Sequence, residues 1–322
     1  MNNKSRFNLP IAFGWYAIAE STELSSGEVK ALNYFDRDLA LFRTDSGTVQ
    51  LVDAMCPHLG AHLGHGRVEG DNVVCPFHGW KFNGDGFCTD VPYAKRMPPK
   101  IDGKPCLKHY HVQELNQMIW AWFHPEDQAP LFELGKIEEL NSDGWEKPVI
   151  YQWTIAAPIQ ETGENAVDTA HFAYVHTADS VPEAEVIIDG YSRETRMFSK
   201  VKGLNEDGTR TDDHSGSVEL NSLSFGPGQT IQRIGGIFNV VMMGTVTPID
   251  ADTTHMRFVY ATPKGLSDDE KMMQVAFQKA TVDQVEEDIP IWNHKFYNPE
   301  PILCDGDGPI AQYRKWFKQF YN

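Results

Sequence analysis

Short apolar runs recur through the first third of the chain and are separated by turn residues. Residues 14–19, 29–35, 39–44 and 49–53 each have the length and the β-branched or aromatic content of a strand. The tripeptide Asp-Ser-Gly at 45–47 predicts a turn between the last two. Short strands with turn signals about every 8 to 12 residues are typical of an antiparallel sandwich. The pattern therefore predicts an all-β N-terminal domain.

The second half of the chain changes to a mixed pattern. Residues 149–155 alternate between apolar and polar positions, and a helical period follows over about 159–175. Strand patterns return over 186–262. A long helix should begin after Ser267, which suits an N-cap because three acidic residues follow it, and should run toward Trp292. This half is predicted to be α+β, with an antiparallel sheet against a long C-terminal helix.

An acidic, irregular segment separates the two patterns at about residues 125–144. We therefore expect two domains, over residues 1–128 and 129–322. The length of 322 residues is enough for each domain to bury a core of its own.

The charge balance limits the classes of partner. A formal net charge of −17 argues against nucleic acid and anionic membranes as ligands. No run of about 18 apolar residues is present, and the N-terminal residues lack an apolar core segment, so neither a membrane span nor a signal peptide is expected.

The chain contains five cysteines, and an odd number disfavours a disulfide framework. We expect Cys88, Cys106 and Cys304 to be free, partly buried thiols, which favours a reducing, cytoplasmic compartment.

The other two cysteines belong to a motif that carries chemistry. Cys56 is followed by Pro and His58, and after a short spacer Cys75 is followed by Pro, Phe and His78. Two thiolates and two imidazoles suit either zinc or an iron–sulfur cluster. Because each loop pairs one Cys with one His, the order favours a [2Fe–2S] cluster with two Cys on one iron and two His on the other. A small zinc ribbon is the alternative.

A second candidate metal site lies in the predicted helix at 159–175. His171 and His176 are five residues apart, which is about 140° of rotation on an ideal helix, so they can share one ion only if the helix ends or bulges between them. Two His and one carboxylate make a facial triad for Fe(II). Asp168 lies three residues before His171 and can hydrogen-bond its imidazole. The third ligand must come from elsewhere, and the C-terminal helix offers four carboxylates: Asp283, Glu286, Glu287 and Asp288.

These stretches resemble known families. The sequence from Cys56 to Trp80 resembles the Rieske motif, and Asp168-x-x-His171-x-x-x-x-His176 resembles the signature of Rieske non-haem iron oxygenases. Residues 165–176, 302–310 and 313–321 look like the oxygenase components of 3-ketosteroid 9α-hydroxylases, and cholesterol 7-desaturases share something similar.

The resemblance implies an N-terminal Rieske [2Fe–2S] domain and a helix-grip (START-like) catalytic domain. It implies that Cys56, His58, Cys75 and His78 hold the cluster. It also points to Asp288 as the third ligand of the mononuclear Fe(II), with Glu286 and Glu287 as alternatives, and places Asn165 near this iron. In the family, the residue matching Asp168 links the iron of one subunit to the cluster of the next, which implies a homotrimer. Ala170 stands where ring dioxygenases often carry Tyr, which favours monooxygenase or demethylase chemistry.

The expected activity is that of a terminal oxygenase using O2 and electrons from NAD(P)H, delivered by a separate ferredoxin and/or flavin reductase. The expected substrate is hydrophobic and steroidal, with hydroxylation as the reaction and oxidative demethylation or desaturation as alternatives. A Rieske electron-transfer or lipid-binding protein without the mononuclear iron is the alternative of another class. A steroid requires a long apolar pocket, for which the candidates are Val186, Ile187, Phe225, Ile237, Phe238, Val240, Val241, Met242 and Met243.

Overall fold

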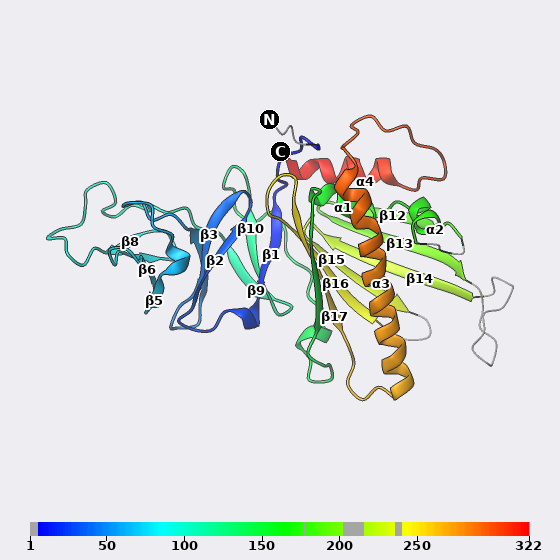
Figure 1. Cartoon of the computed structure of the whole chain (residues 1–322), viewed down its shortest axis with the longest axis horizontal. Coiled ribbons are helices and arrows are strands. Elements are labelled where there is room, and N and C mark those ends of the chain that lie inside the picture. Colours follow the sequence, from blue (N-terminus) through cyan, green and yellow to red (C-terminus); the bar gives the residue numbers. More distant parts are fainter. Residues whose placement is uncertain (1–5, 177, 179, 202–215, 236–239, 322) are drawn as a thin grey trace. The chain divides into compact units, whose positions relative to one another are not determined.

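The computed structural model describes residues 6–176, 178, 180–201, 216–235 and 240–321. The chain divides into two compact units, each described here by itself (Figure 1). The first spans Trp15–Leu131, and the second combines Phe132–Asn322 with the residues before Trp15.

The expected division at residue 128 assigned the N-terminal segment to the first domain, whereas the structure places it in the second unit. Phe7 is buried in a cluster with Ile155 and Trp292. The backbone N–H of Phe13 donates to the carbonyl of Phe320 (2.8 Å). These contacts attach the segment to the second unit, and no periodic pattern in so short a stretch indicated them.

The first unit is built from three small sheets, in which β9 and β10, β2 to β4, and β5 to β8 pair with their neighbours antiparallel. Their strand orders are β1-β10-β9, β2-β3-β4 and β5-β6-β7-β8. The strands are β1 (Gly14–Glu20), β2 (Val29–Tyr34), β3 (Arg37–Arg43), β4 (Val49–Asp53), β5 (Arg67–Glu69), β6 (Asn72–Val74), β7 (Lys81–Asn83), β8 (Cys88–Asp90), β9 (Val112–Leu115) and β10 (Met118–Phe123). The short strands predicted for the first domain are confirmed.

The second unit is one seven-stranded antiparallel sheet with helices packed against it. The strand order is β11-β17-β16-β15-β14-β13-β12. The strands are β11 (Val149–Ile155), β12 (Glu183–Asp189), β13 (Ser192–Val201), β14 (Gly216–Phe225), β15 (Gln229–Gly235), β16 (Val240–Pro248) and β17 (Thr254–Ala261). The helices are α1 (Ile159–Glu164), α2 (Ala170–Tyr174), α3 (Asp268–His294) and α4 (Ile310–Phe317).

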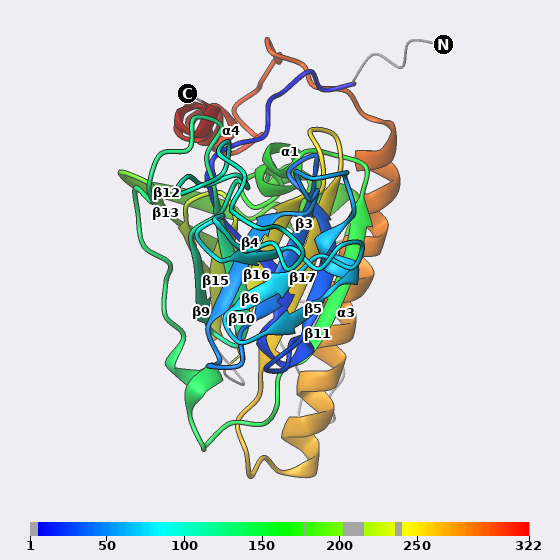
Figure 2. The ribbon, with the colours of Figure 1, turned by 90° about the vertical axis from the view of Figure 1, so that its left-hand side faces the viewer.

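Helix α3 crosses one face of this sheet, and the view turned by 90° shows it running beside β11 (Figures 1 and 2). It begins where the sequence predicts. Ser267 Oγ accepts from the backbone N–H of Glu270, and the Glu270 carboxylate accepts from the backbone N–H of Ser267 (2.8 Å). This capping box satisfies two backbone donors that have no partner within the helix. Val285 and Trp292 of α3 pack against Ile155 and Met256 of the sheet.

The predicted helix over 159–175 is divided into two short helices. Helix α1 ends at Glu164 and α2 begins at Ala170, with an irregular segment between them. Helix α2 then ends at Tyr174, two residues before His176. The helix ends between the two candidate ligands, as their spacing required.

In the part of the chain that the structure describes, no helix is both long and apolar enough to cross a membrane.

Candidate functional site

Two loops of the first unit carry the Cys and His pairs and are built alike. Cys56 and Cys75 each accept, at the carbonyl, a hydrogen bond from the N–H of a glycine four residues on, Gly60 (2.9 Å) and Gly79 (3.0 Å). Both glycines have a positive φ, +74° and +73°, which a residue with a Cβ rarely adopts. Two equivalent turns therefore present the motif residues.

The four side chains form two pairs. Cys75 perturbs the thiol of Cys56 through a side-chain hydrogen bond, and the rings of His58 and His78 lie 4.8 Å apart. Within the described residues, the only set of three or more potential ligands close enough to share one ion lies in the second unit. A thiol pair beside an imidazole pair fits a two-iron cluster better than a single zinc ion.

One unpaired ligand atom supports this fit. Nδ1 of His78 is buried and has no hydrogen-bond partner among the described residues. Burial raises the pKa of the Cys56 thiol to about 12, although the His58 backbone N–H opposes the shift. Such a thiol is a thiolate at neutral pH only when a metal binds it. Trp80, itself largely buried, stacks flat on the His58 ring at 4.6 Å and donates to Tyr93 Oη (2.9 Å), which limits the movement of that imidazole.

The second site joins two distant parts of the second unit. His171 on α2, His176 just beyond it, and Asp288 on α3 each offer a ligand atom, and these atoms lie within 4.8 Å of one another. His176 Nε2 is 3.4 Å from the Asp288 carboxylate. Two imidazoles and one carboxylate are the donor set of a non-haem Fe(II) site.

Helix phase separates Asp288 from the other acidic residues of α3. Val285, Asp288 and Trp292 lie on the buried face, at a spacing that keeps them on one side of the helix. Glu286 is exposed, and Asp283 pairs with Lys279 (2.5 Å). Of the carboxylates left open by the sequence, Asp288 alone belongs to the group that could hold the ion.

Outer contacts fix both imidazoles. His171 Nδ1 donates to the carbonyl oxygen of Asp168 (2.6 Å), while the Asp168 carboxylate is 3.8 Å from the same nitrogen. His176 Nδ1 donates to the Glu287 carboxylate (2.8 Å). With both Nδ1 atoms engaged, Nε2 is the nitrogen that each ring has available for a metal. The sequence predicted a hydrogen bond between Asp168 and His171, and the carbonyl oxygen of Asp168, not its carboxylate, makes the closer contact. The contact of Glu287 with His176 was not predicted.

Asn165 lies beside two of the three candidate ligands, Asp288 and His171. Its Nδ2 donates to the Asp288 carboxylate (2.7 Å) and lies 3.5 Å from His171 Nε2. Burial raises the pKa of Asp288, although its interactions with His176 and His171 oppose the shift. Burial also lowers the pKa of His171, but the hydrogen bond and charge of Asp168 outweigh it, and the net shift is upward.

A cavity of about 290 Å³ opens beside these ligands between the sheet and α3. His171, His176 and Asp288 line it together with Met242, Met256, Phe258, Phe277, Trp292, Trp316, Phe317 and further apolar and polar residues. This volume is near the lower end of the range for small-molecule pockets.

Most of the residues that were candidates for lining an apolar pocket do not line this cavity. Met242 lines the cavity, but Val186, Ile187, Phe225, Val240, Val241 and Met243 do not, and Ile237 and Phe238 lie outside the described residues. On β16, Met242, Gly244 and Val246 face the cavity, so Val241 and Met243 point to the other side of the sheet. The sequence revealed the alternation of side chains along the strand, but not which face of the sheet meets α3.

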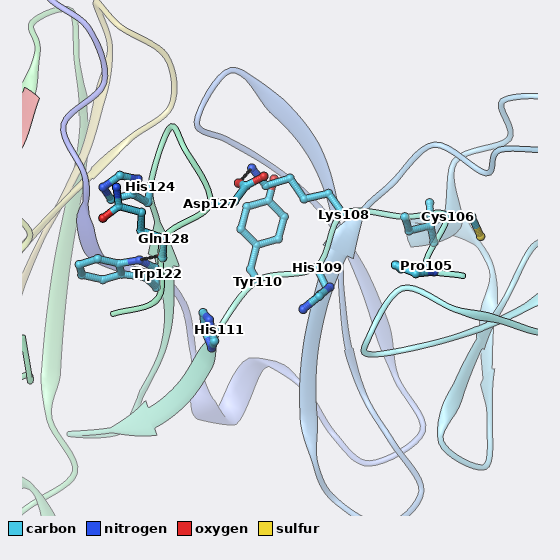
Figure 3. Close-up of a pocket in the computed structure, with 11 residues that line it drawn as sticks. Pro105, Cys106, Lys108, His109, Tyr110, His111, Trp122, His124, Asp127 and Gln128 are labelled. Carbon is cyan, nitrogen blue, oxygen red and sulfur yellow. Dashed lines mark hydrogen bonds and ion pairs between the residues drawn. The ribbon is translucent and has the colours of Figure 1, made fainter. Parts of the chain in front are cut away.

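A cavity of about 410 Å³ lies in the first unit (Figure 3). His109, His111 and His124 are among its lining residues, but Figure 3 shows them pointing in different directions. Lys108 and Asp127, which both line the cavity, form an ion pair. Among the described residues no potential metal-binding group forms here.

Family comparisons cover almost the whole chain. The Rieske [2Fe-2S] domain matches residues 14–111, and the 3-ketosteroid 9alpha-hydroxylase C-terminal domain matches residues 121–321. The oxygenase component of 3-ketosteroid-9-alpha-monooxygenase from Rhodococcus rhodochrous is 30% identical, over 99% of this chain and 85% of that protein. Cholesterol 7-desaturase from Caenorhabditis elegans is 32% identical, over 96% of this chain and 76% of that protein.

Solved structures support the same fold. Dicamba monooxygenase bound to dicamba superposes with a TM-score of 0.75 at 20% identity, covering 96% of both chains. NdmA from Pseudomonas putida CBB5, a QL mutant with caffeine, gives 0.75 at 21% identity, covering 94% of this chain and 89% of that one. The expected fold class is confirmed: a Rieske domain is followed by a domain with an antiparallel sheet and a long C-terminal helix. The chain belongs to the Rieske non-haem iron oxygenases, in the family of the 3-ketosteroid 9-alpha-monooxygenase oxygenase components.

Proposed function

We propose that this oxygenase component hydroxylates a hydrophobic, steroid-like substrate with O2 and with electrons that a separate ferredoxin and/or flavin reductase takes from NAD(P)H. The observation that carries the proposal is the meeting of His171, His176 and Asp288 at the wall of a largely apolar cavity. The relative from Rhodococcus rhodochrous, whose name specifies a 3-ketosteroid, supports the substrate class.

The metal ligands are part of the proposal. Cys56 and Cys75 would hold one iron of a [2Fe–2S] cluster, and His58 and His78 the other. A mononuclear Fe(II) would be held by three further residues, His171, His176 and Asp288. When bound, these groups supply one-electron transfer and oxygen activation.

The chain's own residues prepare the second site. The Asp168 carbonyl and the Glu287 carboxylate orient the two imidazoles by their Nδ1 protons. Asn165 holds the Asp288 carboxylate by a donated hydrogen bond. The burial of Asp288 and of the His176 side chain, which is 3% exposed, keeps water from the ligand atoms. Substrate would lie against the apolar sheet wall beside them.

Electron delivery would pass between subunits of a homotrimer. The Asp168 carboxylate remains 32% exposed beside His171, so a neighbouring subunit could contact it. We place the assembly in the cytoplasm, where the reductase and NAD(P)H are available. An Asp168→Asn variant should keep the trimer and both iron sites but lose most of its turnover. A monomer in solution would contradict this arrangement.

Product mass tests the reaction. The iron-loaded protein is incubated with a flavin reductase and ferredoxin pair, NADH and a panel of 3-ketosteroids, aromatic acids and aromatic methyl ethers. We expect a 3-ketosteroid to gain one oxygen atom, and His171→Ala to abolish the product while leaving the visible spectrum of the cluster intact. Demethylation of an ether with no change in any steroid would refute the steroid assignment.

Desaturation is the second candidate, because cholesterol 7-desaturase is as similar to this chain as the hydroxylase component is. The same assay with cholesterol distinguishes the two reactions. A desaturase removes two hydrogens and adds no oxygen to the sterol.

A further inference from the structure

One row of residues crosses the sheet wall of the cavity and is polar at one end. Arg193, Ser224, Thr230, Gly244 and Phe258 are successive cross-strand partners on β13 to β17, and all five line the cavity. Arg193 Nη2 donates to Ser224 Oγ (3.0 Å), which is 3.1 Å from Thr230 Oγ1. The row therefore ends at a guanidinium that two hydroxyl groups support.

The guanidinium is buried and only partly paired. Arg193 is 3% exposed, and its Nε and Nη1 have no hydrogen-bond partner among the described residues. Its cation lies over the rings of Tyr313 (4.9 Å) and Trp316 (5.2 Å). Ring contacts offset only part of the cost of removing a full charge from water, and they leave the N–H donors unsatisfied. Burial lowers the pKa of Arg193, but a guanidinium stays protonated at neutral pH.

Among the residues that the structure describes, no carboxylate acts as a counter-ion of Arg193. Among the described residues that line the cavity, Asp288 is the sole acidic one. Asp288 already faces His176 and Asn165. The described chain thus leaves a buried cation, with free donors, at the wall of an apolar cavity.

We propose that Arg193 anchors a carboxylate of the bound molecule, so that the cavity selects apolar acids: a steroid-sized ring system that carries one carboxylate. A ketone oxygen could accept one N–H but would leave the charge uncompensated, whereas a carboxylate satisfies both needs. Ser224 holds Nη2 of the guanidinium, which leaves Nε and Nη1 as the donors without a partner among the described residues. The steroid part of this inference rests on the proposed function, but the requirement for an anion depends on Arg193 alone.

Binding measurements separate charge from shape. The probes are a 3-ketosteroid with a carboxylic acid on its D ring and the methyl ester of the same acid. Affinity is read from the fluorescence of the protein, because Trp292 and Trp316 line the cavity. We expect the full-length, iron-loaded protein to bind the acid at least about tenfold more tightly than the ester, as is typical of a buried charge-assisted contact.

Variants assign the preference to one side chain. Arg193→Leu should remove the preference for the acid and leave the affinity for the ester nearly unchanged, and Arg193→Lys should retain part of it. Ser224→Ala tests the orientation and should weaken acid binding by a smaller factor, of the order of threefold. The matched control is Arg196→Leu on the same strand, whose exposed side chain pairs with Glu194 (2.7 Å) and does not line the cavity.

Three results would overturn the inference: equal affinity of the native protein for acid and ester, no binding of either probe, or an acid preference that persists in Arg193→Leu. If Arg193→Leu does not fold, the native comparison and Ser224→Ala still decide. Iron content and oxygen addition are measured separately. Loss of the acid preference would therefore leave the oxygenase proposal standing, and absence of the mononuclear iron would leave acid binding standing.

Discussion

At the scale of single residues, hydrogen bonds determine which nitrogen each histidine can offer. Helix phase places Glu287 and Asp288 on different sides of α3, but both reach His176: Glu287 contacts Nδ1 at 2.8 Å and Asp288 lies 3.4 Å from Nε2. One carboxylate therefore orients the ring while the other shares the site. Sequence spacing alone did not separate these roles, because all the acidic residues of this turn looked equivalent.

Replacing Glu287 with Gln should weaken iron retention. The amide can still accept from His176 Nδ1 but lacks the charge that makes the imidazole a stronger ligand. Loss of such outer contacts typically lowers metal affinity by about 10- to 100-fold. The measurement is the mononuclear iron that remains after dialysis against a chelator. Glu286→Gln, on the exposed face, is the control, and equal iron loss in the two variants would contradict this role for Glu287.

Glu114 provides a pH-dependent test in the first unit. Both oxygens accept from Arg43 (2.8 Å each), and the hydrogen bond from Arg43 holds the pKa of Glu114 below its usual value. A carboxylate whose pKa is lower in the folded state stabilises that state above its unfolded pKa, near 4.3, and loses this contribution as the pH falls through the folded pKa.

Glu114→Gln should therefore cost less than about 1 kcal/mol at neutral pH, because the side chain is 36% exposed and solvent screens the pair. The difference from the native protein should shrink as the pH falls below about 4.3, through the lower folded pKa. Denaturant unfolding at several pH values measures it, with the exposed Asp102→Asn as control. A difference that grows on acidification would show the opposite linkage.

At the scale of elements, periodicity predicted most of the fold. The strands of the first unit and the capped start of α3 followed from local pattern and capping chemistry. The end of α2 before His176 could be anticipated only from the spacing of His171 and His176, and nothing in the sequence indicated the gap between α1 and α2. The face of the sheet that meets α3 could not be predicted, because both faces carry apolar residues and tertiary packing selects one.

The turn at 305–308 supports the segment that carries His171. Gly308 has φ +74°, and a Cβ there would lie 2.6 Å from the Val167 carbonyl oxygen and 3.0 Å from Thr169 Oγ1. Gly308→Ala should destabilise the second unit by about 1 to 3 kcal/mol, through backbone strain and displacement of this segment.

Thermal and denaturant unfolding give this value, and iron content reports any displacement of His171. The control is Gly265→Ala, which has a similar φ (+77°) but nothing within 4 Å of the added Cβ. It should show the strain without the clash, so the two variants should differ in both stability and iron content. Identical behaviour would mean that contact with Val167 has no structural role.

At the scale of the whole molecule, the two units carry different metal chemistry. The first pairs two thiols with two imidazoles, and the second brings two imidazoles to a carboxylate beside a cavity. The sequence predicted Cys56, His58, Cys75 and His78, and also His171 and His176, because each of these sets sits in a compact motif. Asp288 lies on a distant helix and was favoured over Glu286 and Glu287 by the family resemblance alone. It missed Arg193, whose partners Ser224 and Tyr313 come from distant segments and form a site only in the folded chain.

Iron and acid-labile sulfide per chain test the central claim most directly. The account predicts about three irons and two sulfides in the native protein, and about two irons with unchanged sulfide in Asp288→Ala. About two irons in the fully loaded native protein, or no loss of iron in Asp288→Ala, would contradict it.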